Sequence, residues 1–312
     1  MSDDYAAEIE RLLGQAAARC GADERAWDHF LRQLPPPVLR GLIELWGWQA
    51  HGGQKEPAGE WATWLLMAGR GFGKTRAGAE WVWARVRGDP HPAHAAHESP
   101  SPLKGEGVRI ALVGATRDDV VKVMIEGPSG LIRVARHGEE VEWKPSLNRL
   151  RFANGAEAFV YSAEAPEALR GPEHHFAWAD ELAKWGRPSS FGRAGPGSKR
   201  AEAAWDNLMM GLRLGGKPRC MVTTTPRTVP LLKRVMALPG TAVTRGRTTD
   251  NVHLPGAFVE HMCETYGGSR LAAQELDGEL IGQVEGSLFP RELIERCRVA
   301  PFTPPGVTPF TN

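Results

Sequence analysis

The stretch WATWLLMAGRGFGKTRAGAEW, residues 61–81, decides the fold class of this chain. Its first part, 61–68, is a short apolar run that ends at a glycine, which is typical of a buried strand. Residues 69–75 read GRGFGKT, and the segment 75–87 places apolar residues every three or four positions, as on the buried face of a helix. A strand, a glycine-rich turn and a helix in this order are the context of a phosphate-binding loop.

The loop 69–75 has the residue types that hold phosphate groups. Small residues allow successive backbone N–H groups to point into one concavity, and the helix N-terminus adds the positive end of its dipole. One position departs from the usual sequence pattern of a phosphate-binding loop. That pattern has glycine six residues before the lysine, whereas this chain has Ala68 there. The alternative is that 69–75 is an ordinary glycine-rich turn in which the sequence GKT occurs by chance and binds no phosphate. The residues expected to bind nucleotide here are Gly69, Arg70, Gly71, Gly73, Lys74 and Thr75, with Thr75 as a ligand of Mg²⁺.

Further apolar runs follow the loop and alternate with helical patterns. Continuous apolar strands between helices predict an α/β fold with a mainly parallel sheet flanked by helices. Asn154-Gly155 between two β-like runs predicts a hairpin. The expected strands are 108–114, the two arms of 149–163, 175–181 and 218–226, and the expected helices are 116–125, 201–215 and 229–237.

The chain divides into four expected units, with two loop-like insertions in the second unit. The insertions are rich in proline, glycine and serine, which is typical of surface loops. The units are an N-terminal helical segment (1–50), a P-loop ATPase core (51–230, with insertions 88–107 and 186–200), a small helical lid subdomain (231–290) and a linker or tail (291–312).

The composition is that of an ordinary globular chain. Of 312 residues, 42% are hydrophobic and 24% are charged, and the net charge is +1. A net charge near zero does not exclude a nucleic-acid partner, because a local basic groove matters more than the sum. No apolar run is long enough to cross a membrane, and the acidic start MSDDYAAEIE is unlike a signal peptide. We therefore expect a cytoplasmic location and no membrane partner.

Two acids, Asp180 and Glu181, end the apolar strand HFAWADE. Ligands of α/β proteins bind at the carboxyl ends of the strands, where these acids would lie. Asp180 is expected to hold Mg²⁺ through water, and Glu181 is expected to polarise a water for attack on the γ-phosphate. A solvated strand end is the alternative for such a pair taken alone.

Three more features are candidates for roles around the nucleotide. Thr223, Thr224 and Thr225 follow the strand RCMV and could sense the γ-phosphate, although threonines are also common in ordinary turns. Arg70 could neutralise transition-state charge as an arginine finger in cis, or it could form a structural salt bridge. The Gln54 amide could pair with an adenine edge, or it could be solvated.

Together, GRGFGKT, HFAWADE and MVTTTPR resemble the motifs of a known family, the large terminase subunit of tailed phages and phage-like gene transfer agents. The stretches EALRGPEHHFAWADELAKW and RLAAQELDGELIGQVEGSLF are also similar, and the resemblance covers about residues 40–298. It implies a RecA-like P-loop NTPase that hydrolyses ATP and translocates double-stranded DNA into a procapsid. It also implies a ring of copies on the capsid portal and a small terminase subunit as a partner.

By the family's pattern, Lys74 and Thr75 bind phosphate and Mg²⁺, Asp180 binds Mg²⁺, and Glu181 is catalytic. The same pattern makes Arg70 act in cis and Gln54 contact adenine. Residues Thr223 to Thr225 then couple hydrolysis to movement. The implied cofactors are ATP and Mg²⁺.

Two departures from the family leave other functions open. The insertions 88–107 and 186–200 look longer than the family's loops. The family also carries a C-terminal nuclease domain with metal-binding aspartates, whereas no aspartate follows residue 290, so no nuclease activity is expected from this chain. The alternatives are a helicase-like DNA-stimulated ATPase, for which 230–312 is too short to form a second motor domain, and an inactive prophage remnant that only binds nucleotide.

Overall fold

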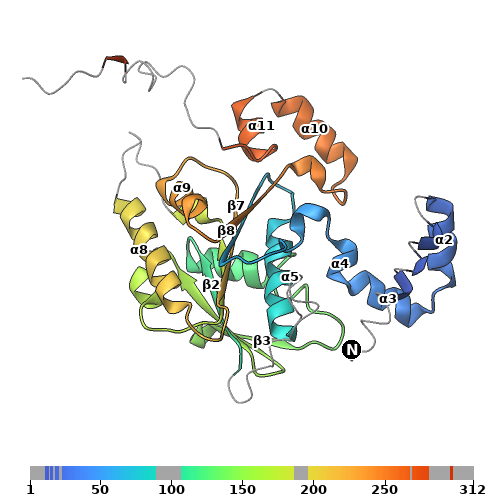
Figure 1. The fold of residues 1–312 in the computed structure, drawn as a ribbon, viewed down its shortest axis with the longest axis horizontal. Helices are drawn as coiled ribbons and strands as arrows, with labels where there is room; N and C mark the ends of the chain where they lie inside the picture. Colours follow the sequence, from blue (N-terminus) through green and yellow to red (C-terminus); the bar gives the residue numbers. More distant parts are fainter. Residues whose placement is uncertain are drawn as a thin grey trace, which may run out of the picture.

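The computed structural model describes residues 11–280, apart from 14, 17, 21–22, 89–106, 186–195 and 268, together with 296–297. Most of the two expected insertions and of the expected tail therefore lies outside the described residues. Within the described part, the chain forms one sheet with helices on both of its faces (Figure 1). The predicted α/β architecture with a mainly parallel sheet is confirmed.

The sheet has eight strands in the order β3-β4-β5-β2-β6-β7-β1-β8. All neighbours pair in parallel except β3 with β4 and β4 with β5, which are antiparallel. The strands are β1 (Thr63–Ala68), β2 (Arg109–Gly114), β3 (Val141–Lys144), β4 (Arg149–Phe152), β5 (Glu157–Ser162), β6 (Phe176–Asp180), β7 (Arg219–Thr224) and β8 (Thr241–Gly246).

Helices cover both faces of the sheet, and further helices lie outside the α/β core near its N-terminal and C-terminal segments. Figure 1 shows α5 on one face of the sheet and α8 and α9 on the other. The α-helices are α2 (Glu24–Gln33), α3 (Pro36–Glu44), α4 (Trp46–Gln49), α5 (Lys74–Arg87), α6 (Arg117–Asp119), α7 (Leu182–Trp185), α8 (Pro196–Gly211), α9 (Pro230–Ala237), α10 (Gly256–Tyr266) and α11 (Arg270–Glu275). A π-helical segment (Val120–Ile125) continues α6, and short 3₁₀ segments are Gly52–Gln54, Pro145–Leu147, Pro166–Leu169 and Thr248–Asp250.

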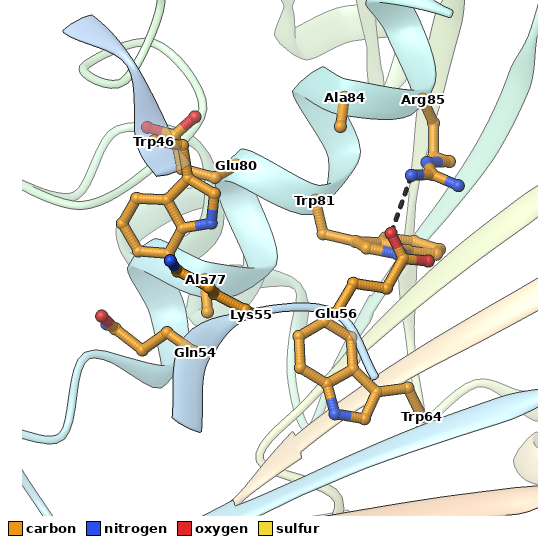
Figure 2. A pocket seen from close by; sticks show the side chains of 10 residues that line it. All are labelled: Trp46, Gln54, Lys55, Glu56, Trp64, Ala77, Glu80, Trp81, Ala84 and Arg85. Carbon is orange, nitrogen blue, oxygen red and sulfur yellow. Dashed lines mark hydrogen bonds and ion pairs between the residues drawn. The ribbon is translucent and has the colours of Figure 1, made fainter. Parts of the chain in front are cut away.

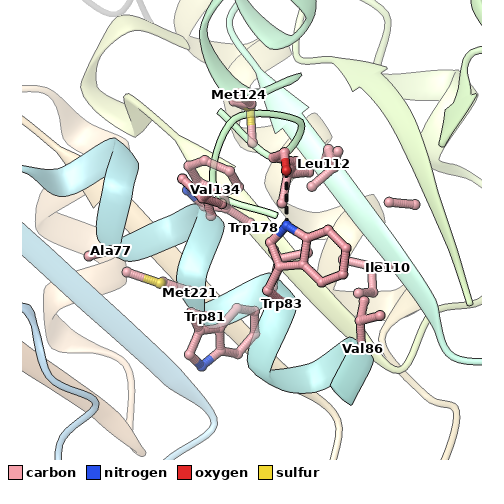
Figure 3. Close-up of a cluster of buried hydrophobic side chains, with 14 of the residues drawn as sticks. Ala77, Trp81, Trp83, Val86, Ile110, Leu112, Met124, Val134, Trp178 and Met221 are labelled. Carbon is pink, nitrogen blue, oxygen red and sulfur yellow. Dashed lines mark hydrogen bonds between the residues drawn. The ribbon is translucent and has the colours of Figure 1, made fainter. Parts of the chain in front are cut away.

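Alternate residues of each central strand enter two separate hydrophobic cores. Along β1, Leu66 packs under α5, whereas Leu65 packs under α8 and α9, because successive side chains of a strand point to opposite faces. Figure 3 shows the core under α5, where the Trp83 indole N–H donates to the carbonyl of Leu131 at 2.9 Å. Helices on both faces explain why the central strands are apolar at every position.

The hairpin predicted at Asn154-Gly155 is present between β4 and β5. Gly155 has φ +87°, and the Asn154 side chain accepts from the N–H of Ala156 at 3.1 Å while donating to the carbonyl of Val86 at 2.7 Å. The turn residues therefore also tie the hairpin to the end of α5.

Two details of the predicted elements are wrong. The helix expected at 201–215 begins at Pro196, inside the expected insertion, and ends at Gly211 instead of at the Gly215-Gly216 pair. Strands β3 and β8 were not predicted. Both are edge strands with side chains that are partly exposed, so their sequences lack the continuous apolar run of a central strand.

Residues 231–246, which fall inside the range expected for the lid, lie in the α/β core. Helix α9 packs on the sheet, and β8 pairs with β1. The segment 247–280, called the helical lid below, contains α10 and α11, which lie together beyond the end of the sheet (Figure 1, orange). None of the helices in the described ranges is long and apolar enough to cross a membrane.

Candidate nucleotide-binding site

Three predicted motifs meet at the carboxyl edge of the sheet. Strand β7 lies between β1 and β6, with Asp180 in register with Thr223 and Met67 in register with Thr224. The loop after β1, the acids after β6 and the threonines of β7 are therefore neighbours. A cavity of about 830 Å³ opens there, and its lining includes Arg70, Lys74, Thr75, Glu181, Thr225 and Arg227.

The glycine-rich loop turns sharply into α5. Gly73 is the N-cap of the helix with φ +93°, and Gly71 has φ +74°. Both angles lie in the left-handed region, where glycine is favoured because a side chain would be strained. A Cβ atom on Gly73 would also collide with the Gln54 amide. The two glycines therefore set the path that brings Lys74 to the cavity.

Lys74 is folded onto the loop that precedes it. Its buried ammonium donates to the carbonyl of Ala68 at 2.9 Å and to that of Gly69 at 2.8 Å. Burial lowers the pKa of the Lys74 ammonium, and the nearby Glu181 and Asp180 carboxylates oppose this shift. The loop carbonyls thus hold a cation at the position from which the predicted phosphate contact would be made.

Arg70 is held by the helical lid through both its backbone and its side chain. Its N–H donates to the carbonyl of Glu275 at 2.6 Å, and its carbonyl accepts from the Thr248 hydroxyl at 2.6 Å. Its guanidinium Nε lies 2.7 Å from the Glu275 carboxylate, and this hydrogen bond raises the pKa of Arg70. The structure therefore shows the salt bridge that was the alternative for Arg70, within the cavity where the arginine finger was predicted.

Gln54 is buried beside the loop, and its amide binds backbone groups. The Nε2 atom donates to the carbonyl of Gly73 at 3.1 Å, and Oε1 accepts from the N–H of His51 at 3.3 Å. The side chain also lines the large cavity. Its contact with adenine stays a prediction, while its contact with the loop is a structural role that the sequence did not indicate.

Asp180 is buried at the end of β6, with one carboxylate oxygen bound by a threonine. The Thr223 hydroxyl donates to Asp180 Oδ1 at 2.6 Å and accepts from the Trp178 indole N–H at 2.9 Å. Burial raises the pKa of Asp180 to about 6, with a contribution from Glu181, while the hydrogen bond from Thr223 acts in the opposite direction. A cation next to this carboxylate would favour its charged form.

Glu181 follows with an unusual backbone conformation. Its φ is +48°, in the left-handed region that non-glycine residues rarely adopt and that is often found at functional sites. Thr225 holds its carboxylate, from the backbone N–H at 3.3 Å and from the hydroxyl at 3.4 Å. The third threonine, Thr224, accepts from the N–H of Ala183 at 3.0 Å in α7. All three threonines therefore position the segment that carries the two acids.

We predict that Thr223→Val destabilises the protein by about 1–3 kcal/mol, because it leaves the buried Asp180 oxygen and the Trp178 N–H without the hydroxyl that joins them. Urea unfolding measures this change. Thr241→Val is the control, since its hydroxyl donates to the carbonyl of Val235 in a partly buried site away from the acids. Equal losses in the two variants would contradict a special role for Thr223.

A second cavity, of about 220 Å³, adjoins the first along α5. Both are lined by Trp46 and Gln54. Figure 2 shows Trp46 on one side of the smaller cavity and Trp64 and Trp81 on the other, with Glu56 paired to Arg85. The Trp81 indole N–H donates to Glu56 at 3.3 Å, and the Arg85 guanidinium lies over the Trp81 ring, so this tryptophan packs against a buried ion pair.

The structure adds residues to the site that the sequence motifs did not indicate. Lys184 of α7 lines the large cavity, and Asn251 of the helical lid donates to the carbonyl of Gly71 at 2.6 Å. Glu275 contacts Arg70 from a position 205 residues further along the chain. No local sequence pattern could have placed Asn251 or Glu275 at the site. Arg227 could have been found from the sequence, because it follows the three threonines after a single proline.

Comparison with known proteins agrees with the motifs. The family model described as "Terminase large subunit, T4likevirus-type, N-terminal" matches residues 65–194, which include the phosphate loop and both acids. Residues 65–194 are therefore similar to the N-terminal part of large terminase subunits. No curated protein sequence matches the chain.

Solved structures of large terminases share the fold of this chain. The large terminase ATPase domain of Thermus phage P74-26 is similar with a TM-score of 0.51 and 16% identity, over 79% of this chain and 99% of that one. The large terminase of another thermophilic bacteriophage, in complex with ADP, is similar with a TM-score of 0.52 and 13% identity. That match covers 77% of this chain and 52% of the phage protein, so the chain spans about half the length of this second terminase.

Proposed function

We propose that this chain is the ATP-hydrolysing motor of a terminase large subunit and drives double-stranded DNA packaging into phage or gene-transfer-agent capsids. The observation that carries the proposal is the arrangement of Lys74, Asp180 and Glu181 at one edge of the sheet, with the acids held by Thr223 at the end of the adjacent strand and by Thr225 just after it. The similarity of the fold to a phage terminase bound to ADP supports the choice of nucleotide.

The large cavity has the charge and size for a nucleoside triphosphate. Its volume of about 830 Å³ is within the usual range for ligand pockets. Lining cations outnumber the one lining acid, Glu181, which suits a polyanionic ligand. These cations are Arg70, Lys74, Arg76, Lys184 and Arg227.

The residues present also fit Mg²⁺. Among the described residues, no cluster of three or more His, Cys, Asp or Glu side chains is placed to hold a metal. Mg²⁺ commonly takes one or two protein ligands and completes its shell with waters and phosphate oxygens. Thr75 and Asp180 would hold it, and when bound it would neutralise charge on the β- and γ-phosphates.

The chain's own groups then divide the work of hydrolysis. Lys74 would exchange its hydrogen bonds to the two loop carbonyls for hydrogen bonds to phosphate oxygens. Arg70 would break its salt bridge with Glu275 and bind the negative charge of the phosphates. Glu181 would orient a water for in-line attack, because Thr225 holds its carboxylate at the cavity wall. Since Thr223 and Thr225 bind the acids and Thr224 binds the backbone of α7, a change at the acids would be passed to β7. This is the coupling we propose for Thr223 to Thr225.

We also propose the organisation and partners that the terminase resemblance implies. The ATPase core would extend through β8, and the helical lid (247–280) would hold the phosphate loop through Thr248, Asn251 and Glu275. Copies of the chain would form a ring on the portal of a procapsid, and a small terminase subunit would assist in choosing the DNA.

The proposal predicts that the purified chain hydrolyses ATP in the presence of Mg²⁺ and that double-stranded DNA stimulates the turnover. Phosphate release with and without DNA, and with EDTA in place of Mg²⁺, measures both effects. Strand displacement in the same samples should be absent, because packaging does not require unwinding. Nucleotide binding without turnover would contradict the motor function, and efficient unwinding would contradict packaging.

A further inference from the structure

Arg227, the last residue of the motif MVTTTPR, is a cation of the cavity wall to which neither the sequence analysis nor the proposed reaction gives a role. It follows Thr225 after a single proline, between β7 and α9, and its side chain is 42% exposed. It lines the same cavity as Lys74 and Glu181. Arg227 also lies only two residues after Thr225, which binds the Glu181 carboxylate.

The Arg227 guanidinium shares one carboxylate with Arg70. Glu275 Oε2 lies 2.7 Å from Arg70 Nε, and Glu275 Oε1 lies 3.6 Å from Arg227 Nη2. The second distance is beyond hydrogen-bonding range, so the Arg227 pair is a looser electrostatic contact. The Glu275 side chain is only 12% exposed, whereas the two arginines are far more open.

This arrangement is unbalanced in charge. Two guanidinium groups share the Glu275 carboxylate, and Glu181 adds a weaker attraction on Arg70, whereas five cations in all line the cavity. A terminal phosphate carries close to two negative charges and three acceptor oxygens, so it matches two guanidinium groups better than one carboxylate does. The loosely held Arg227 would be released from Glu275 at little cost.

We propose that Arg227 binds the terminal phosphate of a nucleoside triphosphate, beside Arg70, and thereby distinguishes the triphosphate from the diphosphate. This inference rests on the proposed function, because it requires the cavity to bind ATP. Contact with the terminal phosphate draws Arg227 away from Glu275. The side chain then connects the state of the nucleotide both to the helical lid and to the threonines of β7.

The test compares binding of ATPγS and of ADP, each with Mg²⁺, to the full chain and to Arg227→Ala. The variant should bind ATPγS about 10- to 100-fold more weakly, while its affinity for ADP changes by less than about twofold. The affinity of Arg227→Lys for ATPγS should lie between that of the unaltered chain and that of Arg227→Ala, since lysine keeps the charge but lacks the planar guanidinium. Calorimetric titration or a fluorescent nucleotide provides both dissociation constants.

Arg234→Ala is the matched control. Arg234 lies on α9, has a side chain that is 44% exposed, and pairs with Asp206 at 2.6 Å instead of with a group of the cavity. This control should leave both affinities unchanged. Glu275→Gln should tighten binding of ATPγS, because the competing carboxylate charge is removed while the side chain keeps its size.

The outcomes separate this inference from the proposed function. Equal weakening of ATPγS and ADP in Arg227→Ala, or no change for either, overturns the inference while the proposed function stands. If Arg227→Ala does not fold, Arg227→Lys decides, and an unchanged ratio of the two affinities there overturns it. Failure of the unaltered chain to bind either nucleotide overturns both.

Discussion

Replacing Lys74 with alanine should abolish ATP hydrolysis and weaken nucleotide binding. The ammonium is the buried cation at the phosphate loop, and it makes two hydrogen bonds to loop carbonyls that phosphate oxygens would replace. Losing a preorganised charge of this kind costs about 100-fold or more in turnover. Phosphate release at saturating ATP and DNA measures the first effect, and titration with ATPγS measures the second.

The fold should survive this change, because alanine removes the buried ammonium together with the free-energy cost of its desolvation. Circular dichroism and urea unfolding check that. Lys217→Ala is the control, since Lys217 is 57% exposed and pairs with Glu60 at the surface. If DNA-stimulated turnover in Lys74→Ala equals that of the unaltered chain, GRGFGKT is not the phosphate-binding loop of this protein.

Replacing Glu181 with glutamine should separate binding from turnover. Glutamine has almost the same shape and can still accept from Thr225, so the cavity wall and the affinity for ATP should be preserved. The amide is a much weaker base than the carboxylate and cannot polarise the attacking water. We expect a fall in turnover of about 100-fold or more, the scale of general-base catalysis.

The dissociation constant for ATPγS and the single-turnover rate, measured on the same preparation, provide the two readouts. Glu142→Gln on the exposed face of β3 is the control, since that side chain is 65% exposed. A loss of nucleotide binding in Glu181→Gln would assign Glu181 a structural role, because its left-handed backbone and its bonds to Thr225 would then be what the site requires.

The central strands and the phosphate loop could be predicted because their signals are local. An apolar run, a glycine-rich turn and an amphipathic segment follow one another along the chain at β1 and α5, so each constrains the next. The edge strands β3 and β8 gave no such signal. Their pairing is decided by which neighbours the sheet offers, and their partly exposed side chains do not have to be apolar.

The threonine motif shows where local information ends. Thr223 to Thr225 were predicted to act near the γ-phosphate because they follow a strand next to other motifs. That role stays a prediction. The register of β6 with β7 places the Thr223 hydroxyl on Asp180, and Thr225, which follows β7, contacts Glu181. Strand order and register depend on contacts between distant segments, so the sequence predicted the residues of the site but not the contacts among them.

By itself the sequence determined the glycine-rich turn between β1 and α5, because seven consecutive residues, 69–75, set both the backbone path and the position of Lys74. It also determined that two acids end a buried strand. Only the tertiary structure decided what restrains the arginines of the site. Glu275 reaches Arg70 and Arg227 from the helical lid, and packing across the whole domain brings these three side chains together. Charged groups separated so widely along a chain meet only when the folded core fixes their distance, which no local pattern of residues can specify.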